Sequence, residues 1–315
     1  MKRILSINVC RSIIRSTFFY AVVLCLLACV AVDAQKKQPT NKAKQYPFKV
    51  EVTGHGRPMI LIPGLYSSGQ VWESTVARYK AHYECHVLTL AGLAGEPPTT
   101  APFLENVRLG LADYIRAKKL RKPVVVGHSM GGFLALWLAS KEPELVGPIV
   151  VIDMLPFLPA AQQQNATPET VKPRAEMMRK AILAQTPEQR QQMQVTLFQA
   201  MITDPAKVSL VAEWGAASDP NTIAQAMYEM FTIDLRPELP RIKASTLVIG
   251  TWVGLRQYAT RERIEQNFRE QYAGLSGYKF VMSEKAKHFV MFDDPDFLFK
   301  EMDSFLASQN RKDGK

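Results

Sequence analysis

The stretch VVVGHSMGGFLALWLAS, residues 124–140, decides the fold because it joins a short strand pattern to an apolar helix pattern through a glycine-rich turn. The β-branched run Val124–Val126 is typical of a buried strand, and residues 130–140 are long enough for a helix. A serine at such a junction, with glycines two positions away on either side, lies on a strained turn that lifts its hydroxyl clear of the sheet. We therefore predict that Ser129 is a nucleophile.

Strand and helix patterns alternate on both sides of this stretch. Apolar runs that predict strands occur at residues 48–52, 58–62, 86–90, 149–152, 246–250 and 278–282, and helical patterns at residues 103–118, 261–272 and 295–306. Short strands that alternate with helices predict a mostly parallel central sheet with helices on both faces, an α/β fold.

The alternation stops between Pro156 and Pro240, where no strand pattern occurs. Instead, a capping residue stands directly before a proline at four places, which predicts four helix starts. These pairs are Thr167-Pro168, Thr186-Pro187, Asp204-Pro205 and Asp219-Pro220. We therefore predict a core in two parts, residues 46–155 and 241–308, an all-helical cap at 156–240 and a flexible tail at 309–315.

The first 34 residues differ in composition from the rest of the chain. A basic start is followed by the almost entirely apolar stretch Thr17–Val32, and small residues precede Gln35. This pattern predicts a secretory signal peptide, residues 1–34, followed by a disordered leader, residues 35–45. A membrane anchor is the less favoured reading, and a lipid anchor on Cys29, in the lipobox-like LLAC, is a third. The expected location is secreted or periplasmic, or, with lipid on Cys29, the surface of a membrane.

Charge and cysteine content narrow the function classes. Cleavage after Ala34 would lower the net charge from +10 to +7, and the basic residues form no stripe apart from the short leader. We therefore expect no nucleic acid as partner. Only Cys85 would remain, which excludes an intramolecular disulfide in the mature chain and predicts a buried structural thiol. The oligomeric state is left open.

A serine hydroxyl needs a base and an oxyanion hole. Of the five histidines, His288 follows the last predicted strand and precedes the final helix, so we expect it at the same sheet edge as Ser129. His128, inside the turn, should point elsewhere. For the oxyanion hole we predict the N–H groups of Met130, at the start of a helix, and of Leu65, in the turn after an early strand.

These motifs together resemble the capped α/β-hydrolase family. The matching pieces are PG…S…W at residues 63–72, TLAGLAG at 89–95, the serine turn at 127–132, LVIG at 247–250 and HF…DP at 288–295. The resemblance spans nearly all of the chain outside the signal peptide and the insertion. It implies a Ser–His–acid triad, an oxyanion hole, a helical lid that selects the substrate, and no cofactor or metal.

Two positions depart from the family pattern. Pro63 stands where a histidine is usual, and the segment after Gly250, residues 251–257, holds no carboxylate where the family places its acid. Asp153, at the end of the preceding strand, is the best remaining candidate for the acid. The alternative is that Asp153 is a structural residue at a strand end, in which case His288 acts alone or with a carboxylate such as Asp293 or Glu262.

The favoured reading is a carboxylesterase-like serine hydrolase that cleaves an ester-like bond (carboxylic ester, thioester or lactone) of a small to medium, apolar substrate. Methionines and phenylalanines of the insertion would line part of its pocket. An aminopeptidase of the same fold would need cap acids such as Glu176, Glu213 or Glu229 to hold an ammonium group. A non-catalytic binding protein on the same scaffold is the alternative hypothesis from outside the enzymes. Dehalogenase and epoxide hydrolase chemistry is disfavoured, because their nucleophile is an aspartate.

Overall fold

The computed structural model describes residues 45–313. The predicted signal peptide, Cys29 and nearly all of the predicted leader lie outside this range. Within it, no helix is long and apolar enough to cross a membrane.

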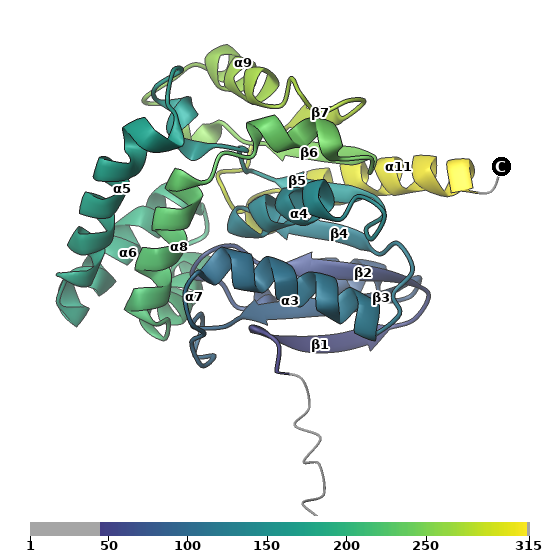
Figure 1. The fold of residues 1–315 in the computed structure, drawn as a ribbon, viewed down its shortest axis with the longest axis horizontal. Coiled ribbons are helices and arrows are strands. Elements are labelled where there is room, and N and C mark those ends of the chain that lie inside the picture. The colour runs from purple at the N-terminus through teal and green to yellow at the C-terminus, as the bar shows by residue number, and fades with distance from the viewer. Residues whose placement is uncertain (1–44, 314–315) are drawn as a thin grey trace, which may run out of the picture. The chain divides into compact units, whose positions relative to one another are not determined.

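A seven-stranded sheet forms the centre of the described residues (Figure 1). Its strand order is β1-β3-β2-β4-β5-β6-β7. Strand β1 pairs with β3 in antiparallel fashion and every other pair is parallel, which confirms the predicted mostly parallel sheet. The strands are β1 Phe48–Gly54, β2 Arg57–Ile62, β3 Tyr83–Leu90, β4 Val124–His128, β5 Ile149–Ile152, β6 Thr246–Gly250 and β7 Lys279–Met282.

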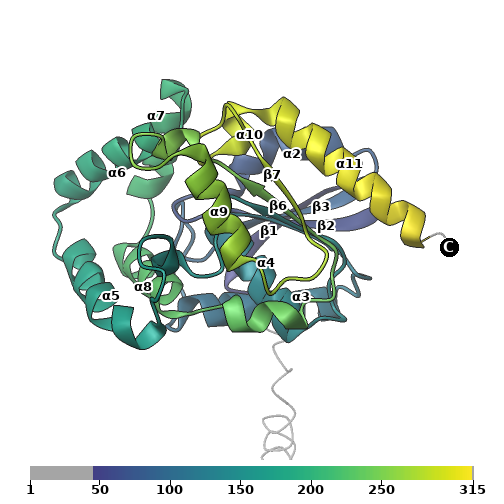
Figure 2. The ribbon, with the colours of Figure 1, turned by 90° about the horizontal axis from the view of Figure 1, so that it is seen from above.

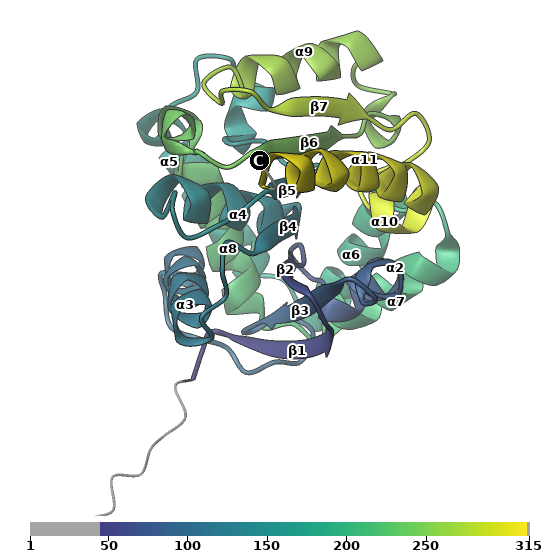
Figure 3. The ribbon, with the colours of Figure 1, turned by 90° about the vertical axis from the view of Figure 1, so that its right-hand side faces the viewer.

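The central strands are buried on both faces, because helices cover each side. In β2, Ile60 and Ile62 pack into one hydrophobic cluster, whereas Met59 and Leu61 pack into the other. Figure 3 shows α3 and α4 on one side of the sheet and α2 and α11 on the other. The helices that flank the sheet are α2 Glu73–Tyr79, α3 Phe103–Ala117, α4 Met130–Lys141, α9 Arg261–Gln271, α10 Val290–Asp293 and α11 Pro295–Asp313.

The segment between β5 and β6 contains helices only. They are α5 Pro168–Leu183, α6 Pro187–Met201, α7 Pro205–Ala216 and α8 Pro220–Thr232, with short 3₁₀ helices at Leu158–Ala161 and Arg236–Arg241. Helix α5 packs against α8, and α6 against α7. Each predicted N-cap residue accepts a hydrogen bond from a backbone N–H of its helix, which confirms the four helix starts. Figure 2 shows α5 and α6 at one end of the strands and the end of α11 at the other.

The C-terminal end of the chain differs from the prediction. A flexible tail was expected from residue 309, but α11 continues to Asp313. Leu306 and Gln309 are both buried, and Gln309 is a polar residue that an apolar pattern does not include. The helix therefore continues after its apolar pattern has ended, which is why the pattern placed its end too early.

Candidate active site

The turn between β4 and α4 holds Ser129 in a backbone conformation that side chains rarely adopt. Its φ is 52° and its ψ is −122°. A Cβ on Gly127 would lie 2.2 Å from the Gly131 carbonyl oxygen, and one on Gly131 would lie 2.1 Å from the Ile62 carbonyl oxygen. Both positions therefore require glycine, as expected for a sharp turn at which a strand and a helix come into close contact.

A second turn, after β2, lies directly against Ser129. A Cβ on Gly64 would be 3.2 Å from the Ser129 Cβ. The Ser67 N–H donates to the Gly64 carbonyl at 3.2 Å, and Tyr66 has a φ of 66°, which is the geometry of a type II turn. Within residues 45–313, no group accepts a hydrogen bond from the Leu65 N–H. The Met130 N–H belongs to the first helical residue of α4, which has no partner one turn earlier. Both donors suit the predicted oxyanion hole.

Asp153 directly follows β5 and binds the predicted base. Its φ of 49° turns the chain out of the sheet, and its N–H donates to the Ile249 carbonyl at 2.7 Å. The Nδ1 of His288 lies 2.6 Å from Asp153 Oδ2, with the two side chains 22% and 13% exposed. A histidine that donates Nδ1–H to a carboxylate keeps Nε2 free to accept a proton. The structure thus brings together the two residues that the sequence paired, and their catalytic role stays a prediction.

Thr251 holds the Asp153 carboxylate from the other side. Its N–H donates to Asp153 Oδ1 at 2.9 Å and its hydroxyl to Oδ2 at 2.7 Å. Thr251 follows β6, where the family pattern places its acid, and is buried. At this position the chain thus supplies two hydrogen-bond donors to the carboxylate of Asp153, which directly follows the neighbouring strand β5. Sequence reasoning missed this role, since nothing local to Thr251 signals it.

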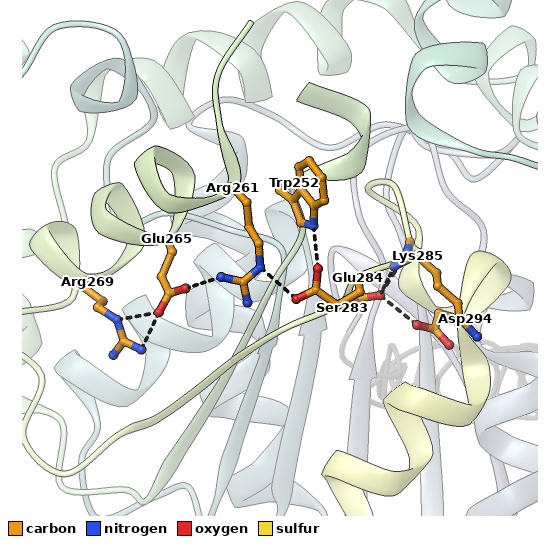
Figure 4. A network of polar contacts seen from close by, with 9 residues as sticks. Trp252, Arg261, Glu265, Arg269, Ser283, Glu284, Lys285 and Asp294 are labelled. Atoms are coloured by element: carbon orange, nitrogen blue, oxygen red, sulfur yellow. Dashed lines mark hydrogen bonds and ion pairs between the residues drawn. The ribbon is translucent and has the colours of Figure 1, made fainter. Parts of the chain in front are cut away.

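The loop that carries His288 is fixed at its base by polar contacts (Figure 4). The fully buried Ser283 donates its hydroxyl to Asp294 at 2.8 Å and accepts from the N–H groups of Lys285 and Ala286. Glu284 accepts from the Trp252 ring N–H at 3.2 Å and from Arg261 at 2.8 Å. The ion pairs continue along α9 through Glu265 to Arg269. Fixed side chains therefore hold both ends of the segment from which His288 projects.

His128 lies beneath His288, which the sequence analysis did not anticipate. Its ring centroid is 4.6 Å from that of His288, and its Nε2 donates to the His288 carbonyl at 3.1 Å. The His128 side chain is fully buried, and its Nδ1 has no partner among the described residues. Burial and the neighbouring His288 hold the pKa of His128 well below its ordinary value of 6.5. His128 is therefore a neutral support for the His288 backbone, and it joins the serine turn to the histidine loop.

The five other carboxylates considered from the sequence either bind other groups or are exposed. Asp293 accepts from the Lys287 N–H and from Thr203, while Glu262 is exposed on α9. In the cap, Glu229 is buried and accepts from the N–H groups at the start of α3 at 2.7 Å each. Glu176 pairs with Arg179 on the same helix, and Glu213 is exposed. None of these five carboxylates is the described partner of His288, which is Asp153.

Two further expectations concern metals and the thiol of Cys85. Among residues 45–313, no group of three or more His, Cys, Asp or Glu side chains could hold a metal ion. Cys85 is buried in β3, and burial raises the pKa of its thiol to about 11. The thiol is therefore protonated at neutral pH, in agreement with a structural role.

The fold and this site define a class: an α/β protein with a serine elbow and a histidine–carboxylate pair at the carboxyl edge of its sheet. The chain belongs to the alpha/beta hydrolase family, whose model matches residues 59–301. A pimeloyl-[acyl-carrier protein] methyl ester esterase of Vibrio atlanticus is 29% identical over 112 residues, which are 36% of this chain but only 42% of the relative. A Vibrio vulnificus esterase of the same name is 23% identical over 61% of this chain and 74% of the relative.

Solved structures show the same fold. The esterase EaEST of Exiguobacterium antarcticum superimposes with a TM-score of 0.68 at 17% identity, over 82% of this chain and 95% of that one. The enol-lactonase of Burkholderia xenovorans LB400 gives a TM-score of 0.67 at 18% identity, over 82% and 96%. The predicted family and fold class are therefore confirmed.

Proposed function

We propose that the protein is a serine hydrolase that cleaves a carboxylic ester, thioester or lactone through an acyl-enzyme on Ser129. The observation that carries the proposal is the 2.6 Å hydrogen bond between His288 and Asp153, which sets the tautomer that a serine needs. The names of the relatives, which include esterases and a lactonase, support the same bond class.

In the proposed reaction, the Ser129 hydroxyl attacks the substrate carbonyl carbon while His288 Nε2 takes its proton. The N–H groups of Leu65 and Met130 stabilise the oxyanion, and the Asp153 carboxylate stabilises the imidazolium. His288 then gives the proton to the departing alkoxide or thiolate as the carbonyl–heteroatom bond breaks. Water, deprotonated by the same histidine, attacks the acyl-enzyme, which releases the acid and restores Ser129.

The substrate is proposed to be small to medium and apolar. Helices α6 and α7 contribute Phe198 and Trp214 to the hydrophobic cluster that also holds the His288 neighbour Phe289. Phe198 packs edge-on against Tyr66, which lies in the turn next to Ser129, with ring centroids 5.6 Å apart. Apolar side chains of the cap thus lie close to the proposed oxyanion turn, and they favour an apolar acyl or alcohol part.

A fluorophosphonate probe tests the proposal directly, because it modifies only an activated serine. The wild-type enzyme should be labelled at Ser129 and should hydrolyse short p-nitrophenyl esters. Ser129→Ala should lose both properties with little change in thermal unfolding. His288→Ala should lose about as much activity, and the double variant little more, because such residues act as a unit. If Ser129→Ala hydrolyses the esters at the wild-type rate, the assignment is refuted. If the probe does not label the wild-type protein, a non-catalytic binding protein is favoured.

The cap acids named above give little support to an aminopeptidase. An ammonium group would need a free acid in the cap, but both oxygens of Glu229 accept hydrogen bonds and Glu176 is paired with Arg179. Glu213 is the remaining candidate and is exposed. We therefore expect hydrolysis of p-nitrophenyl esters to exceed that of amino-acid p-nitroanilides, and the reverse order would favour the peptidase.

We also propose that the protein is exported, with Gln35 as the first residue of the mature chain. The proposal depends on the basic and apolar pattern of residues 1–34. Mass spectrometry of the exported protein should find Gln35, in part cyclised, at its N-terminus. An acylated Cys29 would instead establish a lipoprotein.

A further inference from the structure

The corner between α6 and α7, residues 199–203, touches the loop that carries His288. The Lys287 ammonium donates hydrogen bonds to the carbonyl oxygens of Gln199 at 2.7 Å and Ile202 at 3.1 Å. The Phe289 N–H donates to the Met201 carbonyl at 3.3 Å. Two residues that flank His288 in sequence are therefore both bonded to the end of one cap helix.

Asp293 makes a second connection to the same corner. Its Oδ1 accepts from the Thr203 N–H at 2.9 Å, and its Oδ2 accepts from the Thr203 hydroxyl at 3.0 Å. The same Oδ2 accepts from the Lys287 N–H at 3.0 Å. One carboxylate thus joins the cap backbone to the residue before His288.

The chemistry of a helix end explains these contacts. The last carbonyl groups of α6 have no N–H partner within the helix and carry its partial negative charge, which an ammonium satisfies. The contacts are also built into the core, because Ile202 and Phe289 are buried in one hydrophobic cluster. Helix α5 contrasts with this corner, since it packs against α8 and leaves Met177 69% exposed.

We propose that the α6–α7 corner positions His288, and that Thr203, Asp293 and Lys287 are positioning residues for the reaction of Ser129. The proposal rests on the proposed hydrolase function. It makes this half of the cap a fixed part of the catalytic machinery, because any movement of residues 199–203 would move His288 against Asp153. A cap motion that admits substrate therefore leaves α6 and α7 in place.

Thr203→Val tests the proposal with a change of one hydroxyl in a side chain of the same shape. The kcat for a p-nitrophenyl ester, per active site titrated with fluorophosphonate, should fall about 10- to 100-fold, the scale of a small misplacement of a catalytic group. The KM should change less than about twofold, because the lost positioning acts in the transition state. Thr203→Ser, which keeps the hydroxyl, should restore kcat. Thr196→Val, at an exposed threonine of α6, is the matched control.

Asp293→Asn is the second variant. Both carboxylate oxygens of Asp293 accept hydrogen bonds, so the NH₂ group of the new amide would face an N–H or O–H donor of Thr203 or Lys287 and could not accept from it. The variant should lower kcat at least as much as Thr203→Val, while Asp296→Asn, at an exposed site three residues away, should leave kcat unchanged. If Ser129→Ala is inactive but both corner variants keep the wild-type kcat, the positioning role is wrong and the hydrolase stands. If Ser129→Ala is fully active, the proposed function itself is wrong.

Discussion

Replacing Asp153 by asparagine is the sharpest test of its proposed catalytic role, because three hydrogen-bond donors already face its carboxylate and limit what the new amide can do. The Thr251 N–H faces Oδ1, while the Thr251 hydroxyl and His288 Nδ1 both face Oδ2. An asparagine has one acceptor oxygen. The backbone N–H of Thr251 cannot reverse its role, whereas the hydroxyl can turn to accept and the imidazole can change its tautomer.

The preferred orientation of the amide therefore places its oxygen on the Thr251 N–H and its NH₂ towards His288. His288 would then carry its proton on Nε2 and could not accept one from Ser129. The opposite orientation sets NH₂ against the Thr251 N–H, which costs about 1–3 kcal/mol for the unsatisfied donor. At about 1.4 kcal/mol per factor of ten, the competent tautomer is disfavoured about 5- to 150-fold.

Loss of the negative charge adds to this effect, since nothing then stabilises the imidazolium. We expect Asp153→Asn to lower kcat by about 10³- to 10⁴-fold, the scale known when a triad acid becomes an amide. The assay is hydrolysis of a p-nitrophenyl ester per titrated serine, with thermal unfolding measured in parallel and Asp296→Asn as a control of the same chemistry. A loss of less than about tenfold, with the fold intact, would refute the role of Asp153.

Three further predictions concern stability and the thiol. Glu229→Gln should lower the free energy of unfolding in urea by about 1–3 kcal/mol, because one of the N–H groups of Phe103 and Leu104 would lose its acceptor. A change below about 0.5 kcal/mol would contradict the role of Glu229 as acceptor at the start of α3. The pKa of His128 is lowered in the folded chain, so below pH 6.5 the unfolded chain binds a proton that the folded chain does not. The free energy of unfolding should therefore fall as the pH decreases, by up to about 1.4 kcal/mol per pH unit from this group. His128→Gln should flatten that slope, and an unchanged slope would contradict the assignment. Burial raises the pKa of the Cys85 thiol to about 11, so Cys85 should react with iodoacetamide at pH 8 only after unfolding. Rapid labelling of Cys85 in the native protein, located by mass spectrometry of its peptide, would contradict its burial.

The parts of the fold that the sequence predicted are those with local signals. Runs such as Val124–Val126 identify buried strands by composition, and a capping residue before proline, as at Thr186-Pro187, identifies a helix start within a few residues. The end of α11 was placed too early because the buried residue Gln309 is polar and so does not continue the apolar pattern. The strained turn at Ser129 was predictable for the same local reason, since the glycines that it requires are its near neighbours.

The surroundings of the acid depend instead on pairing between distant strands. Strands β5 and β6 pair in parallel with Ile152 opposite Ile249, so the chains that leave them carry Asp153 and Thr251 side by side, although the whole cap separates the two in sequence. The family pattern suggested that an acid was missing after β6. In the structure that position supplies two hydrogen-bond donors to Asp153, which directly follows the neighbouring strand. Thr251, which binds the Asp153 carboxylate, thus occupies the position after β6 where the family pattern places an acid. Only the pairing register of β5 and β6 reveals this relation between the two residues.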